Sequence, residues 1–357
     1  MTATILLKKA IAAAVALAAL GGFGAAQAKD VLGVACANPP PAHCSGEACV
    51  PMLNDPGAAT DPKTGRKFFL DYPCNLKTGE KVIFILNIHG AGSIGQWQRH
   101  YFPAMDGKEK YRLVVATPTA ATSPSRTPGA PGVRVWVPDA DDAHLQNITE
   151  LVFEAFGRKN IKSFWLAGHS QGGITSHRIV CTDFFKDKVD GLLSLSGGRI
   201  GRSEMNPRFG PPLADGSPPP PRALPAAAMA PPLPACEFSH IYETGEHEIV
   251  SLPDTSPLAD RFGCGKRVEL PEVVDDKPGY VWDYARAGYP VWGMKARPGT
   301  AKVYVYPHCK GGRVVADVVR LDKGHTEGLE PKVTDAILKL IASAPGGKAQ
   351  RLQTAMR

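Results

Sequence analysis

Short apolar runs, each followed by a polar or glycine-rich turn, recur through most of the chain. Several are apolar almost throughout, which is typical of strands buried on both faces of a parallel sheet. The segments with strand character are residues 67–71, 81–88, 111–116, 161–167, 189–195, 239–244, 301–306 and 314–321.

Amphipathic segments alternate with these runs. Residues 142–156 place their apolar side chains on one face at helical spacing, and Gly157 ends that segment. Residues 172–180 and 331–342 also suit helices. Strands that alternate with helices in this order predict an α/β fold with a doubly wound, mostly parallel sheet and helices on both faces.

Changes of composition divide the chain further. Residues 206–235 are too rich in proline for a helix or a sheet interior, and we interpret them as a flexible surface insertion, with a lid as the alternative. The expected organisation is a signal peptide at 1–28, an irregular Cys- and Pro-rich extension at 29–66, one α/β domain at 67–345 containing the insertion, and a flexible C-terminal tail at 346–357.

The N-terminal segment has the features of a secretory signal. Lys8 and Lys9 precede an apolar run at 10–26, which ends in an A-x-A cleavage pattern at 26–28. A membrane anchor is the alternative, but the run is rich in alanine and glycine, and no other window is long and apolar enough to cross a bilayer. We therefore expect a secreted or periplasmic protein whose mature form has no stable membrane span.

The cysteine count agrees with export. The cysteines are Cys36, Cys44, Cys49, Cys74, Cys181, Cys236, Cys264 and Cys309. An even number in an exported chain fits disulfides. Spacing does not fix connectivity; we expect two bridges among the first four and one between Cys181 and Cys236. A zinc site made of His43 and the first three cysteines is the alternative, although a repeated C-x-x-C pattern is missing.

The charge pattern excludes one class of partner. The formal net charge is +7, but no tract of five or more basic residues occurs, and aromatic residues are not interleaved with Arg or Lys. Nucleic-acid binding is therefore not expected.

A nucleophile motif follows the strand at 161–167. Gly168-His169-Ser170-Gln171-Gly172 matches G-x-S-x-G, between an apolar strand and a segment that suits a helix. A serine on such a sharp turn needs small neighbours two residues away, and Gly168 and Gly172 meet that need. The alternative is a turn in which the serine is incidental. We interpret Ser170 as a nucleophile exposed at the carboxyl edge of the sheet.

A glycine-rich turn after the strand at 81–88 predicts an oxyanion site. The turn reads His89-Gly90-Ala91-Gly92. One backbone N–H donor is expected from Gly90 or Ala91, and the second from Gln171, directly after the nucleophile. An ordinary glycine-rich loop is the alternative.

The base is expected near the C-terminus, because hydrolases with this elbow order their triad as Ser, acid, His. His325 follows the strand at 314–321 and precedes the last helix. His308 lies one strand too early, and His177 falls within the helix after the elbow. We therefore assign the general base to His325.

The acid must lie between the nucleophile and the base. After the strand at 239–244, Glu248 occupies the acid position of a G-x-x-D pattern, and Glu is accepted in this role. Glu246 and Asp254 remain alternatives.

Taken together, these motifs resemble the secreted polyhydroxybutyrate depolymerase and feruloyl esterase group of α/β-hydrolases over roughly residues 80–342. The residues that carry the resemblance are His89-Gly90, Trp136, Asp141-Asp142, the elbow, Cys264, Cys309 and Gly324-His325. The resemblance implies the α/β-hydrolase fold and a disulfide near the catalytic histidine, which pairs Cys264 with Cys309.

The expected activity is that of a serine carboxylic-ester hydrolase working through an acyl-serine intermediate on a small or polymeric ester, with no metal or organic cofactor. A serine peptidase of the same fold and a non-catalytic binding protein on a hydrolase scaffold are the alternatives. Aromatic residues are candidates for the substrate cleft, without a choice among them. They are Trp97, Tyr101, Trp136, Trp282, Tyr284, Tyr289 and Trp292.

Overall fold

A computed structural model describes residues 30–41, 56–124, 129, 131–201, 233–248, 252, 255–284, 288 and 290–355. Several predictions concern residues outside these ranges. They are the expected signal peptide, nearly all of the proline-rich insertion, Cys44, Cys49, Asp254 and Tyr289.

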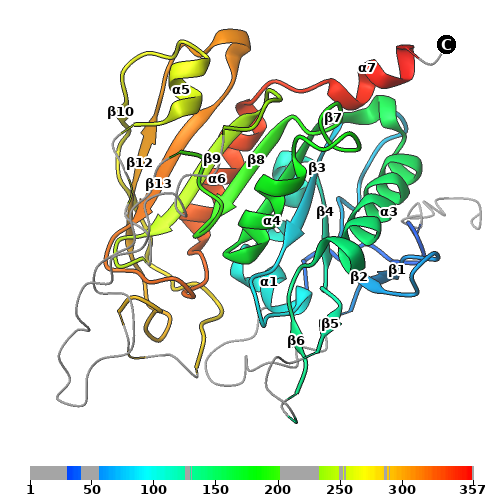
Figure 1. Ribbon diagram of the computed structural model, residues 1–357, viewed down its shortest axis with the longest axis horizontal. Helices are drawn as coiled ribbons and strands as arrows, with labels where there is room; N and C mark the ends of the chain where they lie inside the picture. Colours follow the sequence, from blue (N-terminus) through cyan, green and yellow to red (C-terminus); the bar gives the residue numbers. More distant parts are fainter. Residues whose placement is uncertain are drawn as a thin grey trace, which may run out of the picture.

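One twisted sheet forms the centre of the molecule (Figure 1). Its strands are β1 (Ala58–Thr60), β2 (Lys67–Asp71), β3 (Val82–Ile88), β4 (Leu113–Pro118), β7 (Ile161–His169), β8 (Gly191–Leu195), β9 (Ser239–Gly245), β10 (Val268–Glu269), β11 (Val273–Val274), β12 (Thr300–Val305) and β13 (Val315–Arg320). A separate short hairpin joins β5 (Thr122–Ser123) to β6 (Val133–Arg134).

The strand order defines the fold class. It runs β1-β2-β4-β3-β7-β8-β9-β13-β12-β10, with β11 also pairing with β12. The strands from β4 to β13 along this order are parallel, whereas β2 is antiparallel to β4 and β12 to β13. This is the order of an α/β-hydrolase sheet, so the predicted fold is confirmed. Because the order reverses beside β3, the loops after β3 and β7 meet at one edge of the sheet, where ligands of such sheets bind.

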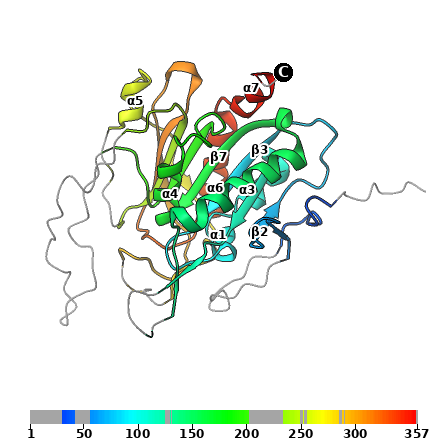
Figure 2. The same cartoon turned by 45° about the vertical axis from the view of Figure 1, so that its right-hand side comes forward.

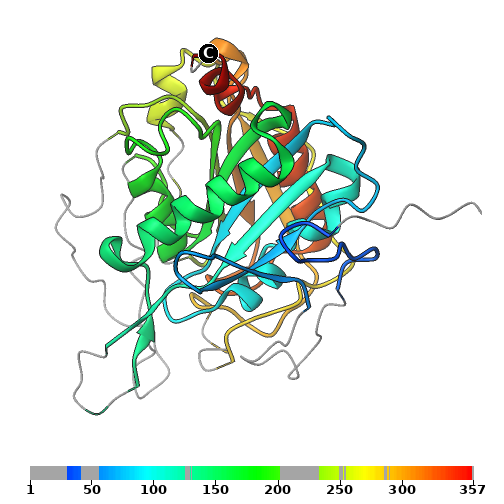
Figure 3. The ribbon, with the colours of Figure 1, turned by 90° about the vertical axis from the view of Figure 1, so that its right-hand side faces the viewer.

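Helices cover both faces. They are α1 (Gly95–Tyr101), α2 (Lys108–Tyr111), α3 (Pro138–Phe156), α4 (Gln171–Ile179), α5 (Pro257–Arg261), α6 (Pro331–Ser343) and α7 (Lys348–Ala355), with short 3-10 turns at Ala104–Gly107, Arg158–Asn160 and Lys310–Gly312. Alternate residues of β3 point into two apolar cores, one shared with α3, α4 and α7 and the other with α1 and α6. Figures 2 and 3 show α3 and α6 on opposite sides of the sheet.

The long helix α3 begins four residues before its predicted start. Pro138 occupies its first turn, and the buried Asp141 carboxylate accepts hydrogen bonds from the amides of Val137 (2.8 Å) and Ala121 (3.0 Å). Arg66 also donates to Asp141, at 2.7 Å. The apolar periodicity locates the helix face but not this polar start, which depends on segments distant in sequence.

Two predicted boundaries are wrong. The extension at 29–66 was expected to stay outside the α/β domain, but β1 lies within it and pairs with β2. The expected tail at 346–357 instead forms α7, which packs on β7 with Ala349 fully buried. The amide side chain of Gln350 donates to the carbonyl of Ile161 at 2.9 Å. The pairing of β1 with β2 and the packing of α7 on β7 both join distant segments, so local sequence predicts neither.

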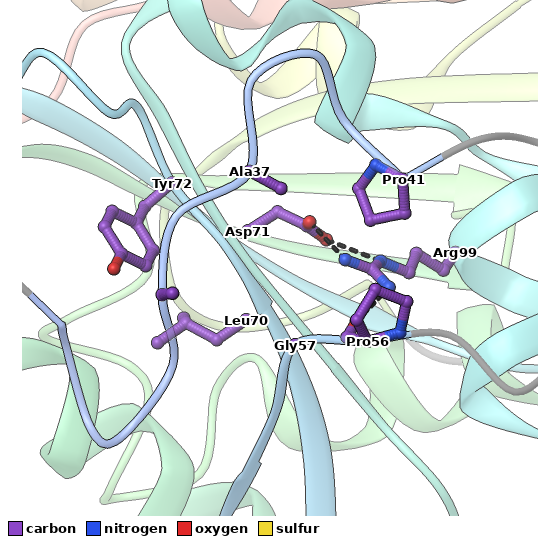
Figure 4. Close-up of a pocket in the computed structure, with 9 residues that line it drawn as sticks. Ala37, Pro41, Pro56, Gly57, Leu70, Asp71, Tyr72 and Arg99 are labelled. Atoms are coloured by element: carbon purple, nitrogen blue, oxygen red, sulfur yellow. Dashed lines mark hydrogen bonds and ion pairs between the residues drawn. The ribbon is translucent and has the colours of Figure 1, made fainter. Parts of the chain in front are cut away.

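The segment before β1 is anchored by an ion pair. Arg99 of α1 donates to both carboxylate oxygens of Asp71 at the end of β2, and to the carbonyl of Pro56 at 2.9 Å (Figure 4). Both charged side chains are buried, and breaking such a pair leaves an uncompensated buried charge. This pair therefore fixes α1 against β2, and the bond to Pro56 ties the segment before β1 to the same guanidinium group.

Three disulfides lie among the described residues. They join Cys36 to Cys74, Cys181 to Cys236, and Cys264 to Cys309. The last two are the pairs expected above, and the first is one bridge within the N-terminal group. Cys36 is thus not available for the alternative zinc site.

The buried carboxylate of Asp190 links the central sheet to the C-terminal helix α7. Its carboxylate accepts hydrogen bonds from the amides of Phe164 (3.0 Å) and Lys348 (3.2 Å). Burial raises its pKa to about 6. A carboxyl group whose pKa is raised by folding stabilises the folded protein at a pH below the pKa that it has in the unfolded chain, near 4. This stabilisation is lost as the pH rises through the folded-state pKa of about 6.

We therefore expect Asp190→Asn to flatten the pH dependence of unfolding. Between pH 4 and pH 8, the free energy of unfolding of the wild type should fall relative to the variant by on the order of 2–3 kcal/mol. Urea unfolding of both proteins at the two pH values measures this difference. Parallel pH profiles would show that Asp190 titrates normally.

Candidate active site

Ser170 stands between β7 and α4 in a strained conformation. Its φ is 51° and its ψ is −117°, a region that residues with a side chain rarely adopt. Its amide donates to the carbonyl of Leu195 on β8 at 2.8 Å. A Cβ on Gly168 would lie 2.3 Å from the backbone carbon of Gly172, and one on Gly172 would lie 2.2 Å from the carbonyl oxygen of Ile88. The elbow therefore requires both glycines, for the reason inferred from the sequence.

His325 reaches Ser170 from the loop after β13. Its Nε2 lies 2.9 Å from Ser170 Oγ, although 155 residues separate the two in sequence. The loop is held in turn by two backbone bonds, from the His325 amide to the Val291 carbonyl (2.9 Å) and from the Thr326 amide to the Trp292 carbonyl (2.7 Å). The imidazole is thus placed to take the Ser170 proton.

Glu248 completes a line of hydrogen bonds. Its Oε2 lies 2.8 Å from Nδ1 of His325, and its side chain is buried. The alternative Glu246 is exposed and accepts a hydrogen bond from the amide of Asp322, at 2.8 Å. His308 lies exposed after β12, and His177 lies half-buried in α4. Of the candidates within the described residues, the structure brings together Ser170, His325 and Glu248.

The expected oxyanion donors lie next to Ser170. A Cβ on Gly90 would lie 3.2 Å from Ser170 Cβ, so this backbone approaches the nucleophile as only glycine allows. The Gln171 amide opens α4, where unbonded N–H groups and the helix dipole favour negative charge. The neighbouring amides of Gly92 and Ser93 already donate to backbone carbonyls. Among the described residues, those of Gly90, Ala91 and Gln171 have no hydrogen-bond acceptor.

His89 braces this turn, a role that the sequence did not reveal. Its Nδ1 lies 2.6 Å from the Gly90 carbonyl, and its Nε2 accepts a hydrogen bond from the Ala120 amide at 2.9 Å. Burial lowers its pKa to about 4, so the ring stays neutral, with the proton assigned to Nδ1 by these partners. The indole of Trp136 donates to the His89 carbonyl, and the Trp136 amide donates to the side chain of Gln171.

A cluster of buried charged side chains surrounds the segment that carries His325, and several of them belong to that segment. Arg320 bonds Glu243 at 2.6 Å, and Lys323 bonds Glu330 at 2.9 Å. Glu327 accepts a hydrogen bond from the amide of Gly324 at 3.1 Å. Burial raises the pKa of Glu243 despite its arginine partner. These groups come together only in the folded chain, so no motif predicts them.

Two of the half-buried aromatic candidates lie near the triad, one beside His325 and one beside His169. The Trp292 ring lies edge-on to His325, with 5.3 Å between ring centroids, and is half-buried. Trp97 is also half-buried and lies 5.6 Å from the His169 ring. Tyr101, Trp136 and Trp282 are buried. Trp292 is therefore the half-buried aromatic candidate whose ring lies beside the imidazole of the base.

Metal clusters and membrane-spanning helices are both absent from the described part of the chain. No group of three or more His, Cys, Asp or Glu side chains there could hold a metal ion. No helix of the described chain is long and apolar enough to span a membrane.

No family model matches the chain, and no curated protein matches it. Solved structures give remote likenesses. The acetyl xylan esterase of Aspergillus awamori is 14% identical, over 80% of this chain and 98% of its own, with a TM-score of 0.41. The fluorophosphonate-binding serine hydrolase F of Staphylococcus aureus is 13% identical, over 58% and 81%, with a TM-score of 0.35.

Proposed function

We propose that the protein is a serine hydrolase of carboxylic esters, with Ser170 as nucleophile, His325 as general base and Glu248 as the acid that orients the base. The observation that supports this most strongly is the unbroken line from Ser170 Oγ to His325 Nε2 (2.9 Å) and from Nδ1 to Glu248 (2.8 Å). Three segments far apart in sequence converge on it.

The geometry gives a role to each group. As Ser170 Oγ attacks the ester carbonyl, Nε2 of His325 takes its proton, and Glu248 stabilises the imidazolium that forms. His325 then gives the proton to the departing alcohol, which leaves an acyl-Ser170 ester. A water molecule deprotonated by His325 then attacks this ester, and His325 returns the proton to Ser170 Oγ as the bond to the acid breaks.

The negative charge of each tetrahedral intermediate falls on the former carbonyl oxygen. The Gln171 amide and the Gly90 or Ala91 amide are its proposed donors, and the Gly90 backbone is already close to Ser170. One such donor typically contributes roughly 3 kcal/mol to transition-state stabilisation. The hydrogen bonds of His89 and Trp136 fix this turn in place before substrate binds.

We propose polyester oligomers or aromatic, feruloyl-type esters as the substrate class. The half-buried Trp292 ring beside His325 supports an apolar or aromatic group in the substrate. We also propose a secreted or periplasmic location. The disulfides among the described residues support it, because such bonds persist in oxidising compartments.

A substrate panel tests the proposal. Short p-nitrophenyl esters, feruloyl esters and hydroxyalkanoate oligomers are compared with p-nitroanilide peptides, using wild type and Ser170→Ala. Turnover of at least one ester class that is absent from the variant is expected. Turnover confined to peptides would instead identify a peptidase, and no turnover with any substrate would favour a binding protein.

A further inference from the structure

The side chain that precedes the nucleophile contacts the loop that carries the base. Nε2 of His169 donates a hydrogen bond to the backbone carbonyl of His325 at 2.8 Å. The hydroxyl of Tyr101, on α1, donates to the same carbonyl at 3.3 Å. His169 adjoins Ser170 in sequence, so one side chain connects the backbone of the nucleophile to the backbone of its base.

The surroundings of His169 fix its orientation. The ring is buried, with its centroid 4.1 Å from that of Tyr101 and 4.9 Å from that of His325. A Cβ on Gly90 would lie 2.8 Å from His169 Nδ1, so the ring also fills the space behind the expected oxyanion turn. His169 therefore contacts the nucleophile, the base and the oxyanion segment without facing the reacting atoms.

The protonation state of the ring follows from its partners. Burial lowers the pKa of His169 well below the usual value, and the nearby His325 lowers it further. Nε2 must carry the single proton, because it faces a carbonyl oxygen. Nδ1 has no hydrogen-bond partner within the described chain, as expected of a bare acceptor enclosed by backbone. The ring is thus a neutral donor at working pH.

Other hydrogen bonds hold the loop to neighbouring elements, and the Leu329 amide donates to the Tyr101 carbonyl of α1 at 2.8 Å. The His325 and Thr326 amides hold the loop to residues 291–292, on one side, and Glu248 holds the imidazole. The hydrogen bond from His169 to the His325 carbonyl ties the loop to the elbow strand β7, and the bond from the Tyr101 hydroxyl adds a second tie to α1. Apart from the His169 bond, the described hydrogen bond that joins this loop to the elbow is the one between His325 Nε2 and Ser170 Oγ, which must break and re-form during catalysis.

We infer that His169 is a positioning residue for the proposed hydrolysis, and that it acts with Tyr101 by holding the His325 carbonyl so that Nε2 stays within reach of Ser170 Oγ. This inference rests on the proposed function. It assigns His169 an effect on kcat, because the alignment matters for proton transfer and not for substrate binding.

Two amide substitutions of different reach test the inference. In His169→Gln the side-chain N–H can lie where Nε2 now lies, whereas in His169→Asn it falls short of the His325 carbonyl. Kinetics are measured with the best ester of the panel. We expect His169→Asn to lower kcat by about 10- to 100-fold with KM changed less than about twofold, and His169→Gln to recover most of the wild-type kcat. Equal kcat values for the two variants, or a loss confined to KM, would overturn the inference.

Tyr101→Phe provides a second measurement if His169→Asn does not fold. It removes the other donor to the same carbonyl while keeping the buried ring, and kcat is expected to fall by about three- to tenfold at unchanged KM. An unchanged kcat would contradict the inference. Failure of the proposed function looks different, because the wild type itself would then show no turnover and no labelling of Ser170 by a phosphonate.

Discussion

Ester hydrolysis by Ser170→Ala is expected to fall roughly 10⁴- to 10⁶-fold in kcat relative to the wild type. The variant keeps the elbow and the oxyanion amides but has no hydroxyl to form the acyl intermediate, so only weak catalysis by water can remain. Steady-state kinetics with the best ester of the panel measure the effect.

The fold should survive this change. The Ser170 hydroxyl makes one described hydrogen bond, which it donates to His325 Nε2, while the strained backbone is held by the Leu195 carbonyl and by the close contacts of the elbow glycines. An unchanged thermal midpoint is the control. A variant with more than about one hundredth of the wild-type kcat would show that another residue is the nucleophile.

The second large effect concerns the acid. Glu248→Gln should lower kcat by roughly 10²- to 10⁴-fold, because a neutral amide neither stabilises the His325 imidazolium nor enforces the tautomer that leaves Nε2 free to take a proton. The two side chains have nearly the same shape, so a loss reports charge and tautomer rather than packing. Kinetics near neutral pH, where His325 must accept the proton, measure it.

Glu246→Gln is the matched control. Glu246 lies two residues away on the same turn, but it is exposed and bonds the Asp322 amide. We expect its kcat to remain within about twofold of the wild type, as is usual for exposed positions away from the site. If Glu246→Gln shows the larger loss, the assignment of the acid is wrong and the loop adopts another arrangement during turnover.

The parts of this site that the sequence predicts are those encoded by local geometry. The elbow is recognisable because a serine on a strained turn needs Gly168 and Gly172, and these requirements lie within five consecutive residues. His325 and Glu248 follow from their places after particular strands, which the fold class dictates. The fold class, in turn, follows from apolar runs that alternate with amphipathic helices.

The rest depends on contacts between distant segments. The start of α3 is fixed by Asp141 binding amides from two loops, and α7 forms because Gln350 and Ala349 meet β7. Neither leaves a periodic signal. His169 lies inside the recognised motif, yet its partner is a backbone carbonyl 156 residues away. A motif identifies such a residue but cannot say what it contacts.

Labelling by a fluorophosphonate, followed by mass spectrometry of the peptides, shows whether Ser170 is a nucleophile activated by His325. We expect one adduct per molecule, on Ser170, and labelling slowed at least about 100-fold in His325→Ala, because the hydroxyl then lacks its base. An unlabelled folded protein, an adduct on another residue, or labelling of Ser170 at the same rate without His325 would contradict it.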